Sequence, residues 1–347
     1  MKIDAIVATD LADAAAAAAR AERLGCDGIM VPEVAHDPFL PLALAAGSTT
    51  RIRLATGIAV AFARNPMSVA VTAADLHRLS GGRFALGLGS QVKAHITRRF
   101  SMQWSSPAAR MREFICAVRA IWDAWDGQAP LDFRGDFYQH TLMTPMFSHG
   151  PSPVGWPSVQ IAAVGPVMTA VAGEVADGLL CHGFTTADYV RDVTLPQLAA
   201  GASRAGRSRS DLEVSLPVMV ALARDERDPE IAAMKGQIAF YGSTPAYRPV
   251  LEHHGWSALG DELHAMSRRG EWQRMGALID DDVLHAFAVV GTPREAGAEI
   301  RARFGGLVDR IQVGINGDEA QFAELFDALR DARPAGAGRP GARYADS

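Results

Sequence analysis

Eight short apolar segments recur along the chain, and stretches with helical patterning separate them. An alternation of strands and helices is typical of βαβ units, in which the strands form a parallel sheet. Eight strands is the number that closes a (β/α)8 TIM barrel, although doubly wound sheets reach similar numbers. We therefore predict an α/β fold, and in particular the barrel. The expected strands cover residues 2–8, 27–32, 52–60, 83–88, 159–163, 178–182, 213–222 and 308–315.

Proline and capping residues mark where three of the helices begin. Asn65 precedes Pro66, which places a side-chain acceptor at the N-cap and a proline at the first helical position. Residues 292–295, Thr-Pro-Arg-Glu, have the pattern of a capping box. The longest amphipathic helix begins at Ser106-Pro107, and its apolar side chains have the spacing of a helix that packs on a core. Those side chains are Met111, Phe114, Ile115, Val118, Ile121, Trp122 and Trp125.

Two long excursions interrupt the alternation, one between the fourth and fifth strands and one after the seventh. Residues 127–156 contain a predicted hairpin at 131–138 and a connection rich in proline and glycine. Residues 224–290 contain helical patches and several turns. Because a barrel scaffold does not need such excursions, they usually carry function or interfaces. We expect one barrel domain over residues 1–333 and a flexible tail over 334–347, which cannot bury enough surface to become ordered.

Composition and missing motifs exclude several classes of function. The net charge is −5 at pH 7, without the basic patch that binds nucleic acid. No apolar run approaches the ~20 residues that span a bilayer, and no signal-peptide layout is present, so we expect a cytoplasmic protein that does not bind membranes. Cys26, Cys116 and Cys181 lie far apart and are expected to be free thiols. No metal site is expected, because His253-His254 lacks a carboxylate and a third ligand, and no dinucleotide-binding glycine fingerprint occurs.

In a barrel of this kind ligands bind at the carboxyl ends of the strands, so the residues after each strand are candidates for a site. The fourth strand runs into Gly89-Ser90, where the missing side chain lets the backbone approach a ligand, and His95 follows within about one turn. After the fifth strand, Gly165-Pro166 begins a helix whose next N–H groups are free and point along the helix dipole. This arrangement predicts a phosphate site, and a β-branched side chain in place of Gly165 is expected to crowd the turn.

Polar residues also follow the second and sixth strands. Glu33 is a carboxylate beside apolar residues, which favours a functional role. His36 and Asp37 either face the ligand or cap the next helix, and for Asp37 the cap is the better interpretation. His182 ends the sixth strand, where it either lines a substrate pocket or is a satisfied core residue.

Four segments occur in an informative order: Asn65-Pro66, Phe84-Ala85-Leu86-Gly87-Leu88-Gly89-Ser90, Gly165-Pro166-Val167-Met168 and Ala176-Asp177-Gly178. With their spacing, the chain resembles the bacterial luciferase-like family of flavin- and deazaflavin-dependent (β/α)8 barrels. The likeness to a subgroup that uses coenzyme F420 extends, with gaps, from about Met1 to Leu329. It implies an oxidoreductase in which the cofactor ring does the chemistry while the protein supplies binding, orientation and electrostatics.

The resemblance also implies roles for residues at the strand ends. Glu33 matches an acidic position that faces the ring and substrate, and the Gly57-Ile58 bond matches a non-prolyl cis peptide that supports the ring in many relatives. Ser90 and His95 match positions that contact the polar edge of the ring or the ribityl chain, so Glu33 and His95 are the expected catalytic residues. The residues expected to bind the cofactor, including its phosphate, are Gly57, Ile58, Ser90, His95, Gly165, Pro166, Val167 and Met168. The residues expected to line the substrate pocket are His36, Phe62, Trp104, Tyr138 and His182.

Two departures from the family pattern bear on the substrate. The sugar-phosphate dehydrogenase branch has a histidine after the acidic residue and a general-acid glutamate after the fourth strand, where this chain has Val34 and Val92. These differences argue against glucose 6-phosphate. We expect hydride transfer between F420 and a small organic substrate, by a protein that forms a homodimer. Two alternatives stay open: a monooxygenase that uses FMNH2, O2 and a partner reductase, and a protein that binds the cofactor without efficient turnover.

Overall fold

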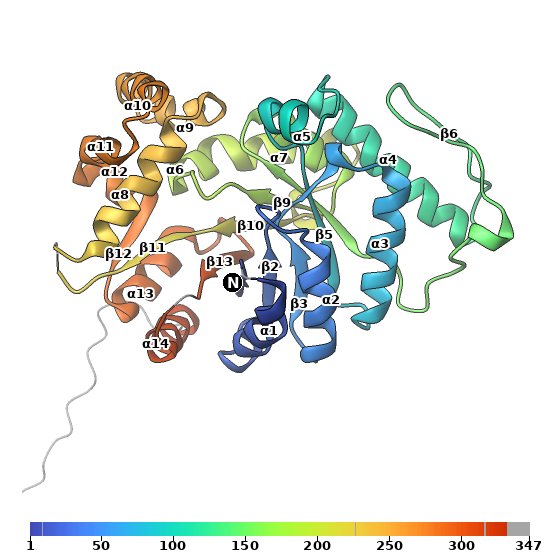
Figure 1. Ribbon diagram of the computed structural model, residues 1–347, viewed down its shortest axis with the longest axis horizontal. Coiled ribbons are helices and arrows are strands. Elements are labelled where there is room, and N and C mark those ends of the chain that lie inside the picture. The colour runs from blue at the N-terminus through green and yellow to red at the C-terminus, as the bar shows by residue number, and fades with distance from the viewer. Residues whose placement is uncertain (9, 226, 316, 332–347) are drawn as a thin grey trace, which may run out of the picture.

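The computed structural model of the chain describes residues 1–8, 10–225, 227–315 and 317–331 (Figure 1). The predicted tail over 334–347 lies outside these ranges. Within them, no helix has both the length and the apolar character needed to cross a membrane.

Parallel strands close into a barrel at the centre of the molecule (Figure 1). They pair in the order β3-β2-β1-β13-β10-β9-β8-β5, and β5 pairs back to β3, with Leu54 opposite Phe84, so the ring closes. The predicted (β/α)8 fold is therefore confirmed. The barrel strands are β1 (Lys2–Ile6), β2 (Gly28–Val31), β3 (Arg53–Thr56) with its continuation β4 (Ala59–Val60), β5 (Phe84–Gly89), β8 (Ser158–Ala163), β9 (Gly178–Cys181), β10 (Glu213–Pro217) and β13 (Arg310–Gly314).

The strand predicted over 213–222 is wrong beyond Pro217. Residues after it leave the barrel, and β11 (Met219–Leu222) pairs with β12 (Ala288–Gly291) in a separate two-stranded parallel sheet. Proline has no N–H to donate to a neighbouring strand, so Pro217 is a natural place for the barrel strand to end. This break directs the chain into the second excursion at the carboxyl end of the barrel.

Helices form the outer layer, and their starts follow the predicted signals. The side chain of Asn65 accepts a hydrogen bond from the N–H of Ser68 at 2.9 Å, and Thr292 and Glu295 form the expected capping box. The helices around the barrel are α1 (Ala14–Arg23), α2 (Phe39–Ser48), α3 (Pro66–Leu79), α4 (Pro107–Trp125), α5 (Pro166–Val175), α6 (Ala187–Tyr189), α7 (Leu195–Arg204), α13 (Pro293–Phe304) and α14 (Glu319–Arg330).

Alternate residues of each strand point outward into the helical layer or inward toward the barrel axis. In β1, Ile3 and Ala5 are buried in the main apolar core, whereas Asp4 lies between them and pairs with Arg310 of the neighbouring strand. The same alternation places Gly178, Leu180 and the residue after the strand, His182, on the inner side of β9. This register decides which side chains reach the barrel mouth.

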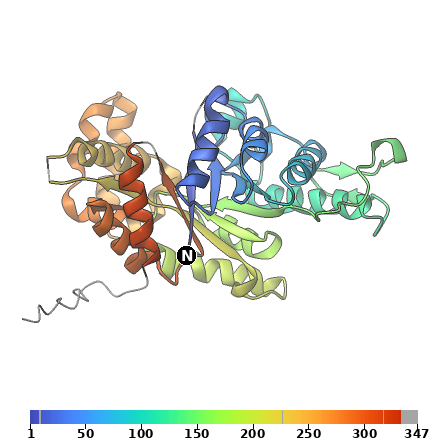
Figure 2. The ribbon, with the colours of Figure 1, turned by 90° about the horizontal axis from the view of Figure 1, so that it is seen from below.

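The two excursions lie at opposite ends of the molecule (Figures 1 and 2). The first contains the short antiparallel pair β6 (Phe133–Arg134) and β7 (Gln139–His140), close to the predicted hairpin. The second has an apolar core of its own, centred on Phe184 and Phe287, whose rings stack at 4.3 Å. Its helices are α8 (Pro229–Gly242), α9 (Arg248–His253), α10 (Ser257–Arg269), α11 (Trp272–Met275) and α12 (Asp281–Phe287).

Candidate functional site

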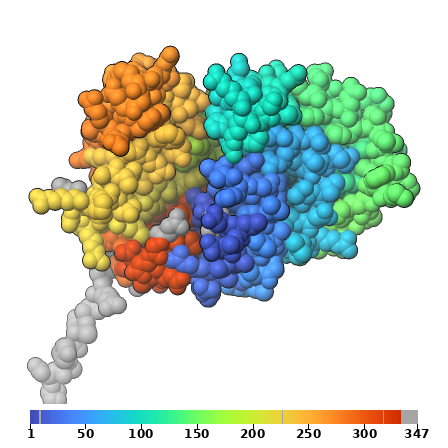
Figure 3. Space-filling view, in the orientation of Figure 1, coloured from blue at the N-terminus to red at the C-terminus, as the bar shows by residue number. Residues whose placement is uncertain are grey.

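The predicted site lies at the carboxyl ends of β2, β3, β5, β8 and β9. In the space-filling view, the segment that follows β5, near residue 100, stands beside the helices of the second excursion along one edge of the molecule (Figure 3). The loops after β2 and β5 are joined, because Nη2 of Arg99 donates to the carbonyl oxygen of Val34 at 2.5 Å. Sequence reasoning did not assign Arg99 a role, since nothing local links it to Val34.

The Gly57-Ile58 peptide bond at the end of β3 is cis, as predicted. A methyl group on Gly57 would lie 1.9 Å from Cγ of Met30, so only glycine fits there. The carbonyl oxygen of Ile58 accepts a hydrogen bond from the N–H of Glu33 at 3.2 Å, and the Ile58 side chain fills the space beside Gly89. The ends of three strands are thus packed together around this bond.

Glu33 is held by protein partners. Its Oε2 accepts hydrogen bonds from the N–H of Val60 at 2.7 Å and from Nη1 of Arg64 at 2.6 Å, and the side chain is 7% exposed. Arg64 also pairs with Oδ2 of Asp37 at 2.7 Å. The other carboxylate oxygen of Asp37 accepts from the N–H of Phe39 at 2.8 Å, so the predicted helix cap is confirmed. This network ties the loop after β2 to the end of the β3–β4 strand.

The other predicted residues near the ring edge lie apart from this network. Ser90 donates to the carbonyl oxygen of Gln91 at 3.2 Å, and Gln91 has a left-handed backbone with φ 58°. His95 is exposed at the start of a π-helical turn over His95–Arg99, and its side chain makes no hydrogen bond or ion pair with the rest of the described chain. His36 is also exposed, with Nε2 at 3.2 Å from Oδ1 of Asp10.

The N-terminus of α5 presents free backbone N–H groups. Val167 and Met168 are in its first turn, where N–H groups have no acceptor within the helix, and Pro166 has no N–H. Gly165 is extended, with φ −79°, and a methyl group added there would meet no atom within 4 Å. The expectation that a side chain at Gly165 would crowd the turn is therefore wrong. A side chain there would instead occupy the space beside the free N–H groups.

Three of the predicted pocket residues gather around an arginine that sequence reasoning missed. The guanidinium of Arg110 lies over the ring of Phe62 at 4.6 Å and donates from Nε to the hydroxyl of Tyr138 at 2.8 Å. Trp104 meets Phe62 edge to face at 6.0 Å. Phe62 is completely buried, and its ring packs against Arg110 and Trp104. The available signal was the place of Arg110, four residues before Phe114 and so on the apolar stripe of α4.

His182 is enclosed by aromatic side chains from the second excursion. Its ring stacks on Tyr247 at 4.3 Å and meets Tyr241 edge to face at 4.9 Å. Nδ1 accepts a hydrogen bond from the N–H of Phe184 at 3.0 Å. Burial lowers the pKa of His182 to about 4, so the ring is neutral near pH 7. The structure thus joins the sixth strand of the barrel to the excursion at this residue.

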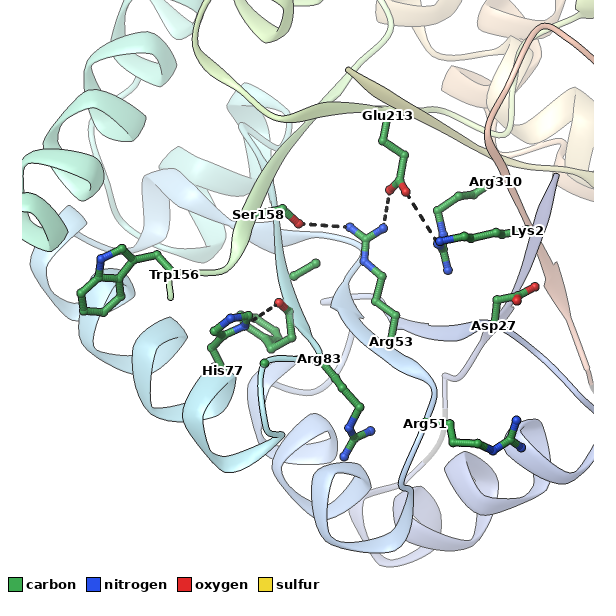
Figure 4. Close-up of a pocket in the computed structure, with 13 residues that line it drawn as sticks. Lys2, Asp27, Arg51, Arg53, His77, Arg83, Trp156, Ser158, Glu213 and Arg310 are labelled. Carbon is green, nitrogen blue, oxygen red and sulfur yellow. Dashed lines mark hydrogen bonds and ion pairs between the residues drawn. The ribbon is translucent and has the colours of Figure 1, made fainter. Parts of the chain in front are cut away.

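A cavity of about 630 Å³ opens at the opposite, amino ends of the strands (Figure 4). Arg53 pairs there with Oε1 of Glu213. The second carboxylate oxygen of Glu213, Oε2, lies 3.6 Å from Nη1 of Arg310, and Arg310 also pairs with Asp4. Burial alone would raise the pKa of Glu213, but Arg53 and Arg310 outweigh it and lower that pKa. None of the predicted site residues lines this cavity. The lining has an excess of positive charge, because five basic side chains (Lys2, Arg51, Arg53, Arg83 and Arg310) stand against two acidic ones (Asp27 and Glu213).

Within the described ranges, His, Cys, Asp and Glu side chains form no group of three or more that could hold a metal ion. Cys26, Cys116 and Cys181 are free, as predicted. Burial raises the pKa of both the Cys26 and Cys181 thiols to about 12, which leaves them uncharged and poorly nucleophilic.

Comparisons with known proteins find relatives that cover most of the chain. An uncharacterised protein of Mycobacterium tuberculosis is 53% identical over 313 residues, covering 90% of this chain and 92% of that protein. A 5,10-methylenetetrahydromethanopterin reductase of Methanolobus tindarius is 28% identical over 284 residues, covering 81% of this chain and 83% of the reductase. The solved structure of the coenzyme F420-dependent tetrahydromethanopterin reductase of Methanopyrus kandleri matches with a TM-score of 0.77 at 23% identity, over 93% of this chain and 96% of that one. The family described as luciferase-like monooxygenase matches residues 3–310, and the chain belongs to that family.

Proposed function

We propose that this chain is an oxidoreductase that transfers a hydride between the deazaflavin coenzyme F420 and a small organic substrate. The relative from Methanolobus tindarius is named a reductase, and the solved reductase from Methanopyrus kandleri is described as F420-dependent. These names favour a deazaflavin over a flavin. The fold and the mouth of the barrel are suited to either, because both cofactors combine a flat ring with a phosphate.

The observation that carries the cofactor proposal is the N-terminus of α5. The N–H groups of Val167 and Met168 are free of helical partners, and the helix dipole adds partial positive charge at this point. The space beside Gly165 is open, so a phosphate can approach these N–H groups without meeting a side chain. The site therefore fits the phosphate end of the proposed cofactor.

The ring end would lie near Ser90, His95 and the Gly57-Ile58 bond. When bound, the deazaflavin supplies the carbon that gains or loses the hydride. Ser90 and His95 each have a polar group that can donate to a ring oxygen. Glu33 already binds Arg64 through Oε2, so we propose that it acts first by positioning the end of the β3–β4 strand.

A flavin-dependent monooxygenase is the second candidate, because the matching family is described in those words. The same helix N-terminus would hold the phosphate of FMN. The two functions differ in which reduced cofactor binds and in whether O2 is consumed. Binding of F420 without turnover of any substrate would support the third alternative, a cofactor-binding protein.

The test is a titration of the purified chain with F420 and with FMN, each oxidised and reduced, followed by quenching of tryptophan fluorescence. We expect F420 to bind more tightly than FMN. The variant Gly165→Val should weaken F420 binding roughly 5- to 150-fold, the equivalent of about 1–3 kcal/mol for the lost hydrogen bonds, without lowering the unfolding midpoint. The control is Gly47→Ala, because a methyl group at Gly47 also meets no atom within 4 Å, but Gly47 lies in the last turn of α2, away from the mouth.

Two results would contradict the proposal. Equal F420 affinity in Gly165→Val and the parent would show that the phosphate does not lie at α5. Tighter binding of reduced FMN, with O2 consumption, would replace the deazaflavin by a flavin. In both cases the control has to bind as the parent does.

A further inference from the structure

His182 follows a barrel strand at the mouth and has no role in the proposed cofactor contacts. It follows Cys181, the last residue of β9, and the strand alternation directs it toward the barrel axis, as it does Leu180. A methyl group on Gly87 of β5, a strand that β8 separates from β9, would lie 2.7 Å from Cδ1 of Leu180, so this face of β9 does point inward. His182 therefore lies one layer above Leu180, at the mouth.

The hydrogen bond to Nδ1 fixes the protonation of this ring. A backbone N–H can only donate, so Nδ1 must be unprotonated to accept from Phe184 at 3.0 Å. A neutral imidazole then carries its proton on Nε2. Protonation of Nδ1 would break this bond and set two donors against each other. The backbone thus selects one tautomer of the neutral ring.

Two tyrosines from the second excursion hold the ring in an uncharged environment. Tyr247 covers one face, with ring planes 24° apart, and Tyr241 meets the ring at 86°. No carboxylate or cationic side chain shifts the pKa of His182, which burial alone lowers to about 4. Tyr247 is itself held in the neutral form, because burial and the nearby Tyr241 raise its pKa to about 12. The ring is consequently a fixed donor that stays neutral across the physiological range.

We propose that His182 donates its Nε2–H to an uncharged carbonyl or hydroxyl oxygen of the substrate, and that Tyr241 and Tyr247 are the residues that position it. An aromatic and neutral enclosure offers no compensation for the charge of a carboxylate, whose desolvation is costly. The site should therefore select aldehydes, ketones or alcohols over acids of the same size. This assignment names the substrate class of the proposed oxidoreductase and so rests on that function.

The role of His182 is to orient the substrate and to polarise its carbonyl bond. In carbonyl reduction a hydride adds to the carbonyl carbon, the π electron pair moves to oxygen, and that oxygen takes a proton from water. The reductant is the reduced deazaflavin of the proposed function. His182 keeps its proton throughout, because its hydrogen bond strengthens as negative charge develops on the oxygen. Oxidation of an alcohol is the reverse of the same steps.

The experiment uses the full chain, labelled with 15N-histidine, as free protein and after addition of F420. Nitrogen chemical shifts should show His182 protonated on Nε2 alone, with a pKa below 5. 2-Butanone should shift the Nε2 resonance at least three times as far as butyrate at equal concentration. Tyr247→Ala should raise the pKa of His182 by one unit or more, whereas Tyr247→Phe, which keeps the stacked ring, should leave it unchanged.

The kinetic arm uses His182→Phe, which keeps an aromatic ring and removes the donor, with the exposed His285→Phe as its control. F420 affinity should be unchanged in both variants, and the rate of 2-butanone reduction by reduced F420 should fall only in the first. Protonation on Nδ1, a pKa above 6, or an equal response to butyrate would overturn the assignment of His182. Failure of F420 to bind would overturn the cofactor instead, because the tautomer and the ketone response are measured without it.

Discussion

Replacing Glu33 with glutamine separates a positioning role for this residue from a direct catalytic one. Glu33→Gln keeps the shape of the side chain and removes its charge. In the structure, Oε2 receives two donors, Val60 N–H at 2.7 Å and Arg64 Nη1 at 2.6 Å. Water cannot take their place, because the Glu33 side chain is 7% exposed.

The expected loss follows from the change in these two hydrogen bonds. Bonds to a charged group contribute about 1.5–3 kcal/mol and neutral ones about 0.5–1.5 kcal/mol, so the substitution should lower the free energy of unfolding by about 2 kcal/mol. For a chain of this length, that corresponds to about 3 °C in Tm. Arg64→Met should cost at least as much, because it leaves Glu33 and Asp37 without their shared cation.

The assay is urea unfolding of both single variants and the double variant, together with F420 affinity and turnover. If Glu33 acts through Arg64 and Val60, the two substitutions should be non-additive by about 1–2 kcal/mol, and Arg64→Met should reduce turnover as Glu33→Gln does. The control is Glu319→Gln, because Glu319 pairs with Arg20 at 2.8 Å but is 55% exposed, so its loss should cost under about 1 kcal/mol.

One combination of results would refute this reasoning. If Glu33→Gln abolished turnover with an unchanged free energy of unfolding, while Arg64→Met was as active as the parent, Glu33 would be a direct catalytic residue. Its free oxygen, Oε1, would then be the atom that meets the substrate. The network with Arg64 would be a separate structural feature.

The remaining predictions concern the barrel itself. Gly87→Ala should destabilise the fold by about 1–3 kcal/mol or more, because the new methyl group would lie 2.0 Å from the carbonyl oxygen of Thr56. A urea unfolding midpoint equal to that of the parent would contradict this close contact between β3 and β5. Glu213→Gln should lower stability at pH 7 by about 2 kcal/mol. The pKa of Glu213 is lowered from its ordinary value of 4.5. Its contribution to the free energy of unfolding is therefore fully present above pH 4.5 and is lost as the pH falls through the folded-state pKa. The difference in stability between variant and parent should consequently shrink in acid. A difference that stays constant from pH 7 to about pH 3 would show that Arg53 and Arg310 do not stabilise the charged form of Glu213.

Much of the fold could be predicted because its determinants are local. Apolar segments of strand length, prolines at first helical positions and capping side chains each act within a few residues, and the structure has them where the sequence placed them. The exception is the strand predicted over 213–222: residues 216–222 are all apolar, but the strand that pairs in the barrel ends at Pro217. There the missing N–H of proline outweighed the pattern.

The site was harder to predict because its interactions join residues far apart in the sequence. Glu33 meets Arg64, Phe62 meets Arg110, and His182 meets Tyr247, in each case from different elements. Sequence reasoning identified one member of each pair but not the other. A charged side chain in an apolar stripe signals that a partner exists without saying which residue supplies it.

The proposed phosphate site and the surroundings of His182 are built from different kinds of groups. The proposed phosphate contacts are backbone groups, the N–H groups of Val167 and Met168. The surroundings of His182 are side chains brought from the second excursion, such as Tyr247. Backbone sites persist when side chains change, whereas an aromatic enclosure changes with each substitution. Replacements within 224–290 should therefore alter which substrate is accepted while F420 affinity stays the same, and the excursion is where specificity would diverge among proteins with this barrel.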